Sequence, residues 1–172
     1  MNKCIDGCVH HQLSSYLIQQ AQEDAENLKK QKGKNNRTTV EMTEKNDFIG
    51  ALAQLGVFET AEELGIVLEK TSPPFNPNAH NDSFDYVHRG VTHDVQGGEM
   101  GVWKETGLPV KIVYPKSRCL VKLAKRDRPM DYYTFCSIDM DEMILHIIGV
   151  MRFTEFWDHK SRFSETTPYP CN

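Results

Sequence analysis

Apolar and polar residues recur along this chain with two different periods, and the change of period separates helical from extended segments. Between residues 8 and 32 the apolar positions lie at helical spacing, at Leu13, Tyr16, Leu17 and Ala21. This segment has no proline and no internal glycine, so we predict one helix over 8–32, followed by a linker at 33–37.

A second helix is the clearest element of the sequence. We predict Thr43 or Asn46 as its N-cap and Gly65 as its end. Its core-facing stripe comprises Phe48, Ala51, Leu52, Leu55, Phe58 and Leu64. Gln54 lies on or beside this stripe, and a polar side chain in that position needs a hydrogen-bond partner.

Beyond Gly65 the period becomes that of strands. We expect a short strand at 66–68, a proline-rich loop at 72–80, and a hairpin of strands 83–88 and 91–96 joined by Arg89-Gly90. Gly97-Gly98 is predicted to interrupt the strand pattern. Further strands are expected at 110–113, 119–123, 132–138 and 143–150, and a closing helix at 153–160 carries Phe156 and Trp157 as core anchors.

This order of elements predicts a mixed α/β fold, in which a central mixed β-sheet is flanked by helices and an extra helix precedes it. The length of 172 residues suits one domain. We divide the chain into an N-terminal helical extension and linker at 1–37, an α/β core at 38–163 and an irregular tail at 164–172.

The cysteine content and the lengths of the apolar runs indicate the cellular compartment that we expect for this protein. Five cysteines at irregular spacing, behind an N-terminus without an apolar export signal, indicate free thiols in a reducing cytoplasm. No apolar run is long enough to cross a membrane, so no membrane partner is expected.

The net charge of -4 argues against general polyanion binding, but it conceals a basic stretch at 111–128. Its bases are Lys111, Lys116, Arg118, Lys122, Lys125, Arg126 and Arg128, against the single acid Asp127. The stretch could contact nucleic-acid phosphates, or it could form an ordinary solvated surface.

A cluster of metal-ligand residue types lies near the N-terminus, at Cys4, Cys8, His10 and His11. Thiolates and imidazoles of this kind can hold Zn²⁺. The four residues are crowded together without the usual paired knuckles, so separate structural roles are the alternative.

The predicted hairpin carries the main chemical signal. Strand alternation places Asp94 and Gln96 on one face and His93 on the other, and Asp85 lies across the hairpin within reach of Asp94. Two converging carboxylates repel each other unless a cation lies between them, and oxygen ligands suit Mg²⁺ or Mn²⁺. The alternative is two acids that face water.

Three segments follow one another along the chain in an order that matches a known family: 46–54 (NDFIGALAQ), then 84–87 (FDYV), then 93–96 (HDVQ). Together they resemble the core of the PD-(D/E)XK nuclease superfamily, the restriction-endonuclease-like fold, over about residues 46–155. The resemblance implies that Asp85 and Asp94 are metal ligands. It also implies that Gln96 stands where the family usually has lysine, and Gln54 where a helix glutamate often stands.

The resemblance implies a phosphodiesterase, endonuclease-like, that acts on DNA with Mg²⁺ or Mn²⁺. Asp85, Asp94, Gln96 and Gln54 would form its catalytic site. Lys104 or Lys111 could supply a displaced amine, and these two lysines together with the basic stretch would contact DNA phosphates. Many nucleases of this type are dimers, so a homodimer is also expected.

Two departures from the family pattern open other possibilities. Glutamine can position a water molecule but cannot carry the charge of lysine or glutamate. One alternative is therefore a catalytically inactive nuclease-fold protein that binds DNA or another protein, such as an accessory factor of a phage or mobile element. Another is an ordinary α/β binding domain, which a sheet without adjacent strands around Asp85 and Asp94 would favour.

Overall fold

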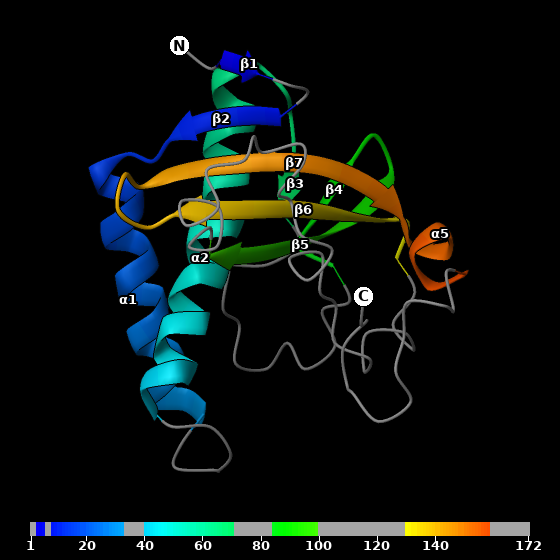
Figure 1. Cartoon of the computed structure of the whole chain (residues 1–172). Coiled ribbons are helices and arrows are strands. Elements are labelled where there is room, and N and C mark those ends of the chain that lie inside the picture. The colour runs from blue at the N-terminus through cyan, green and yellow to red at the C-terminus, as the bar shows by residue number, and fades with distance from the viewer. Residues whose placement is uncertain (1–2, 6–7, 33–39, 71–83, 100–129, 159–172) are drawn as a thin grey trace, which may run out of the picture.

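The computed structural model describes residues 3–5, 8–32, 40–70, 84–99 and 130–158 (Figure 1). Its elements, in chain order, are β1 (Lys3–Ile5), β2 (Cys8–Gln12), α1 (Ser15–Lys32), α2 (Val40–Glu63), β3 (Glu69–Lys70), β4 (Tyr86–His88), β5 (Val91–Glu99), β6 (Tyr132–Asp139), β7 (Ile144–Arg152) and α5 (Phe153–Asp158). Within these ranges, no helix combines the length and the apolar character needed to cross a membrane. The predicted linker at 33–37, the loop at 72–80, the strands at 110–113 and 119–123 and the tail at 164–172 lie outside the described residues.

The described strands form one sheet in the order β1-β2-β7-β6-β5-β4-β3. Strands β5 and β6 are parallel, and every other neighbouring pair is antiparallel. The expected mixed α/β class with a mixed sheet is therefore confirmed. Strands β4 and β5 are neighbours, which is the arrangement that the hairpin pattern predicted.

The sheet separates two apolar clusters, because alternate residues of β6 face opposite ways. Cys136 and Ile138 pack in the larger cluster, with apolar side chains from α1 and α2. Tyr133 and Phe135 pack in the smaller one, with Phe156 and Trp157 of α5. The prediction that these two α5 residues are core anchors is confirmed.

Helix α2 lies very close to β5. Ala53 is fully buried, and a Cβ atom at Gly97 would collide with the Cβ of Ala53 and lie 3.4 Å from the carbonyl oxygen of Ile49. The prediction that Gly97-Gly98 interrupts the strand pattern was wrong, since β5 continues to Glu99. Glycine is needed here because the helix occupies the space of a side chain.

The N-terminal prediction needs a correction at its start. Residues 8–12, expected to be the first turns of the helix, form β2, because their backbone pairs with β7 far along the chain. Helix α1 then begins after Ser14, whose Oγ accepts a hydrogen bond of 3.1 Å from the N–H of Leu17. The expected extra helix is thus present, and the segment 1–37 also contributes two strands to the main sheet.

Two of the predicted stripe positions are wrong. Tyr16 is 76% exposed, because it lies one residue, about 100° of helix rotation, from buried Leu17. Leu64 is 51% exposed, since α2 ends one residue before it.

The start of α2 and the position of the strand that follows it also differ from the predictions. The helix begins at Val40, ahead of both predicted N-caps. Its end is as predicted: at Gly65 the chain leaves the helix, and the N–H of Ile66 donates to the carbonyl of Ala61 at 2.8 Å. The strand expected at 66–68 lies instead at Glu69–Lys70, because those residues are the ones in register with β4.

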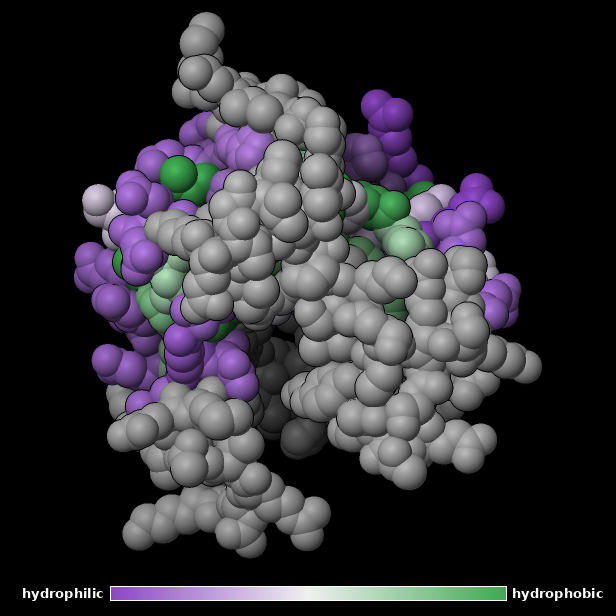
Figure 2. Space-filling view, viewed as in Figure 1, coloured by the Kyte–Doolittle hydropathy of each residue, from purple (hydrophilic) through white to green (hydrophobic). Residues whose placement is uncertain are grey.

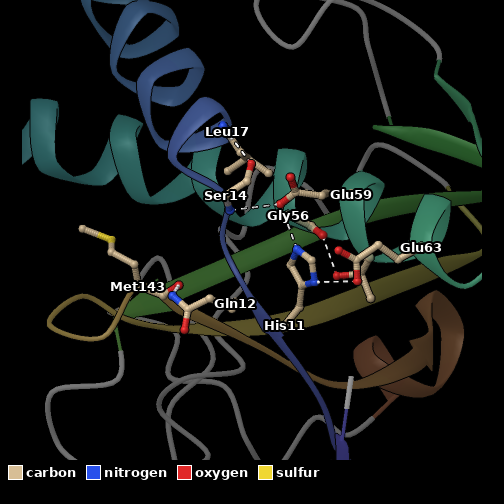
Figure 3. Close-up of polar contacts among 9 residues, drawn as sticks. His11, Gln12, Ser14, Leu17, Gly56, Glu59, Glu63 and Met143 are labelled. Carbon is tan, nitrogen blue, oxygen red and sulfur yellow. Dashed lines mark hydrogen bonds and ion pairs between the residues drawn. The ribbon is translucent and has the colours of Figure 1, made fainter. Parts of the chain in front are cut away.

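A buried histidine joins β2 to α2 (Figure 3). His11 is 2% exposed, and its Nε2 lies 2.8 Å from the Glu59 carboxylate while its Nδ1 lies 3.4 Å from that of Glu63. The N–H of Ser14 also donates to Glu59 at 3.3 Å. Burial raises the pKa of Glu59, but the hydrogen bonds from His11 and Ser14 outweigh it, so the pKa is lower than usual.

The outer surface of the described residues is mostly hydrophilic in the view of Figure 2, with hydrophobic side chains only in separate small areas. Exposed large apolar side chains include Ile66, Val67 and Val150. Apolar residues scattered in this way are normal for a protein surface.

We expect Gly97→Ala to destabilise the fold by about 1–3 kcal/mol, because the new methyl group must push α2 away from β5. Urea unfolding measures the change. Gly149→Ala is the matched control, since a Cβ in this β7 position meets nothing within 4 Å. Equal stability of the two variants would contradict the close helix–strand contact.

The lowered pKa of Glu59 predicts a pH dependence of stability. Its carboxylate stabilises the fold above the ordinary pKa of 4.5, and this contribution is lost as the pH falls through the lower pKa of the folded state. Glu59→Gln should therefore be less stable at neutral pH and lose less unfolding free energy on acidification than the wild type. Urea unfolding from about pH 7 to about pH 3 measures this.

The control for this pH profile is Glu62→Gln, which alters an exposed carboxylate of the same helix. It should keep the wild-type profile. A Glu59→Gln profile parallel to that of the wild type would show that His11 does not stabilise the ionised Glu59.

Candidate functional site

The hairpin of β4 and β5 positions the predicted acidic residues. Its register pairs Tyr86 with His93 and His88 with Val91, and Arg89 and Gly90 form the turn with positive φ of 52° and 77°. Two consecutive positive φ values define the type I′ turn that suits the twist of a two-residue hairpin, and glycine adopts them readily. This local structure confirms the predicted hairpin.

Asp85 lies in a bend directly before β4, and not within a strand as expected. Its N–H still donates to the carbonyl of His93, at 2.7 Å. Beyond this point the Asp85 side chain takes the place of backbone pairing between β4 and β5, because its Oδ2 accepts a hydrogen bond of 2.7 Å from the backbone N–H of Val95. The carboxylate is thereby fixed against β5.

Helix α2 reaches the same carboxylate through Gln54. The Gln54 side chain is 9% exposed, and its Nε2 donates to Oδ1 of Asp85 at 3.0 Å. This contact supplies the partner that a polar residue on the apolar stripe requires. The structure therefore brings together Gln54 and Asp85, two of the four predicted site residues.

The other two predicted residues form a second pair. Asp94 is 5% exposed, and one of its carboxylate oxygens accepts a short hydrogen bond from Nε2 of Gln96. The same amide group lies 3.2 Å from the carbonyl oxygen of Val95. Two oxygen atoms thus converge on one amide nitrogen.

Val95 connects the two pairs through its own backbone. Its N–H donates a hydrogen bond to the Asp85 carboxylate, and its carbonyl oxygen accepts one from the side-chain amide of Gln96. No sequence pattern identifies this role, because every residue other than proline carries the same backbone groups. The alternation of apolar and polar residues did predict which face of β5 Val95 occupies, and it packs against the larger core cluster.

Asp94 also affects the neighbouring strand. It is in register with Tyr133 of β6, whose hydroxyl accepts a hydrogen bond of 3.0 Å from the indole N–H of Trp157. Burial chiefly raises the pKa of Tyr133, and the charge of Asp94 raises it further. The carboxylate therefore lies at the boundary of the smaller apolar cluster, where charge interactions are weakly screened.

The oxygen atoms near Val95 are of the chemical type that hard cations bind. Two carboxylates and one backbone carbonyl are oxygen ligands of the kind that Mg²⁺ and Mn²⁺ prefer, and Mg²⁺ commonly keeps several waters as further ligands. Among the described residues, no group of three or more His, Cys, Asp or Glu side chains is arranged to hold a metal ion. A cation here would depend on Asp85, Asp94, the Val95 carbonyl and water.

His93 has a packed position. Its ring is stacked between those of Tyr86 and Tyr132, at centroid distances of 4.6 and 5.3 Å, and its Nδ1 lies 3.3 Å from the hydroxyl of Thr134. Burial lowers the pKa of His93, and nearby His88 lowers it further. The imidazole is therefore neutral at pH 7 and faces away from Asp94, as alternation predicted.

The predicted zinc cluster is not formed as a unit. His10 and His11 are consecutive in β2 and face opposite sides of the sheet, so they do not converge on one ion. His11 contacts Glu59, whereas His10 contacts His146 of β7. Cys8 is buried, and the side chain of Cys4 is outside the described part.

The predicted basic residues also lie outside the described residues: Lys104, Lys111, Lys116, Arg118, Lys122, Lys125, Arg126 and Arg128. Their expected role in contacting DNA stays a prediction. Comparison of the chain with family models, with curated proteins and with solved structures gives no match.

Asp85 should matter for stability whatever the site does. Asp85→Ala leaves the Val95 N–H and the Gln54 amide without their acceptor, which costs about 1–3 kcal/mol for each buried group. Asp85→Asn keeps one oxygen acceptor and should fall between the wild type and the alanine variant in urea unfolding. Two variants as stable as the wild type would contradict the bridging role of Asp85.

Proposed function

We propose that this chain is a divalent-cation-dependent phosphodiesterase that acts on DNA, with a site formed by Asp85, Asp94, Gln96 and Gln54. The observation that carries the proposal is that the Gln54–Asp85 pair and the Asp94–Gln96 pair both reach the backbone of Val95, the first at its N–H and the second at its carbonyl. Gln54 comes from a helix and Asp94 from a strand, as the resemblance to PD-(D/E)XK nucleases implies, whereas Asp85 lies in the bend directly before β4.

The order of elements supports the restriction-endonuclease-like arrangement that we propose for this chain. Helix α2 is followed by the β4–β5 hairpin, and β5 then pairs in parallel with β6, which is followed antiparallel by β7. The three segments of the family resemblance therefore fall on α2, on the start of β4 and on β5. A sheet that separated these strands would have counted against the proposal.

The chemistry would divide among these residues. Mg²⁺ or Mn²⁺, when bound, would acidify a water molecule and stabilise the charge of the phosphodiester during in-line attack. Asp94 and Asp85 would supply ligand oxygens, and Gln96 would turn its amide from Val95 and Asp94 towards the water. Gln54 would hold Asp85 in place by their hydrogen bond.

A second candidate is a nuclease-fold protein that binds DNA or another protein without cleaving it. The observation that favours it is that each carboxylate accepts a hydrogen bond from a glutamine side-chain amide. These neutral groups stand where the family has a glutamate and a lysine, so the site has neither the extra negative charge nor the ammonium group. A variant that restores both the glutamate and the lysine distinguishes a phosphodiesterase from a protein that only binds.

Nicking of supercoiled plasmid with Mg²⁺ or Mn²⁺ tests the proposal. We expect slow nicking by the wild type and none by Asp94→Asn, which keeps the shape of the side chain but not its charge. Gln96→Lys should accelerate nicking by roughly 100-fold, because an ammonium group assists both water activation and charge stabilisation. Gln96→Met, of similar length but without an amine, is the matched control.

The double variant Gln54→Glu/Gln96→Lys decides between the two candidates. If it cuts and the wild type does not, the fold is that of a nuclease whose site has lost activity. If neither cuts plasmid, branched or single-stranded DNA, while circular dichroism shows both folded, the phosphodiesterase proposal fails.

A further inference from the structure

Two histidines from distant parts of the chain meet on the sheet face opposite α2. His10 of β2 and His146 of β7 are directly opposite in the antiparallel register. Their Nδ1 atoms are 2.5 Å apart, and their rings meet edge to face at 86° with centroids 4.6 Å apart. Residue 11, the next along β2, points to the other face and contacts α2.

This convergence has a simple chemical requirement. Two imidazole nitrogens that approach so closely must hold a proton or a cation between them, because their lone pairs otherwise repel. Imidazole is a preferred ligand of Zn²⁺, Ni²⁺ and Cu²⁺. Metal–nitrogen bonds of about 2.0–2.1 Å in tetrahedral geometry place the two nitrogens about 3.3 Å apart, which small rotations of the His10 and His146 side chains would achieve.

The charge of the His146 ring depends on burial, on His10 and on Asp139. Burial and the neighbouring His10 lower the pKa of His146 to about 4, while the Asp139 carboxylate acts in the opposite direction. Metal ions bind the neutral form of imidazole.

Asp139 supplies a fixed negative charge near this pair. Its Oδ1 accepts hydrogen bonds from the N–H groups of Asp141 and Glu142, at 3.0 and 3.1 Å, so the β6–β7 turn holds the carboxylate in place. A charge fixed near a ligand can orient it and offset the charge of a cation.

We propose that His10 and His146 form a two-histidine site for a transition-metal ion such as Ni²⁺ or Zn²⁺, with water completing the coordination. The site lies away from the Asp85 and Asp94 pairs and uses nitrogen instead of oxygen ligands, so it does not rest on the proposed phosphodiesterase activity. A bound ion would link β2, which precedes α1, to β7 near the end of the described chain.

Isothermal titration of the full, tag-free chain with Ni²⁺ at pH 7.5 tests this proposal. We expect one site, and a thermal unfolding midpoint that rises with the Ni²⁺ concentration. His10→Gln and His146→Gln should each weaken binding by about tenfold or more, because one ligand is lost. His88→Gln is the matched control, since this histidine lies in β4 and contacts the carbonyl of Val67 instead.

Two results would overturn the proposal: no binding by the wild type up to about 1 mM Ni²⁺, or full binding by both His10→Gln and His146→Gln. If either variant fails to fold by circular dichroism, X-ray absorption of the wild type loaded with Zn²⁺ decides. Two imidazole ligands in the first shell would support the site, and a shell of sulfur or of oxygen alone would exclude it.

Discussion

The placement of α2 against β5 is the constraint on which the rest of the structure depends. The contact of Ala53 with Gly97 leaves no room for a side chain at residue 97, so the helix lies directly against β5 at this point. The next residue, Gln54, then reaches Asp85, and about 1.4 turns later Glu59 reaches His11. One helix thus fixes both the candidate site and the N-terminal strand.

Local patterns predicted most of the described elements. Helical periodicity identified α2, and alternation with the Arg89-Gly90 turn identified the hairpin, because both signals depend on residues close in sequence. Strand β2 was missed because its partner is more than 130 residues away, as the separation of 136 between His10 and His146 illustrates. Its single strongly apolar interior residue, Val9, gave too weak an alternation to compete with the helical pattern that follows.

The candidate site shows the same limit in finer detail. A polar residue on an apolar stripe indicated that Gln54 needs a partner, but only the fold identifies Asp85 as that partner. The central position of Val95 has no sequence signature, since its backbone atoms make the contacts. Gly97 was interpreted as an interruption because glycine weakens isolated strands. In the fold, however, glycine is required at this position of β5 because α2 leaves no room for a side chain.

The position of β2 in the sheet has a consequence for biosynthesis. Residues 8–12 leave the ribosome well before the β7 strand with which they pair, Ile144–Arg152. At a translation rate of about 5–20 residues per second, the early strand waits roughly ten seconds or more without its partner. During that interval His11 and Cys8, which are buried in the folded protein, are exposed to solvent. They become protected only when β7 has been synthesised and the sheet is complete.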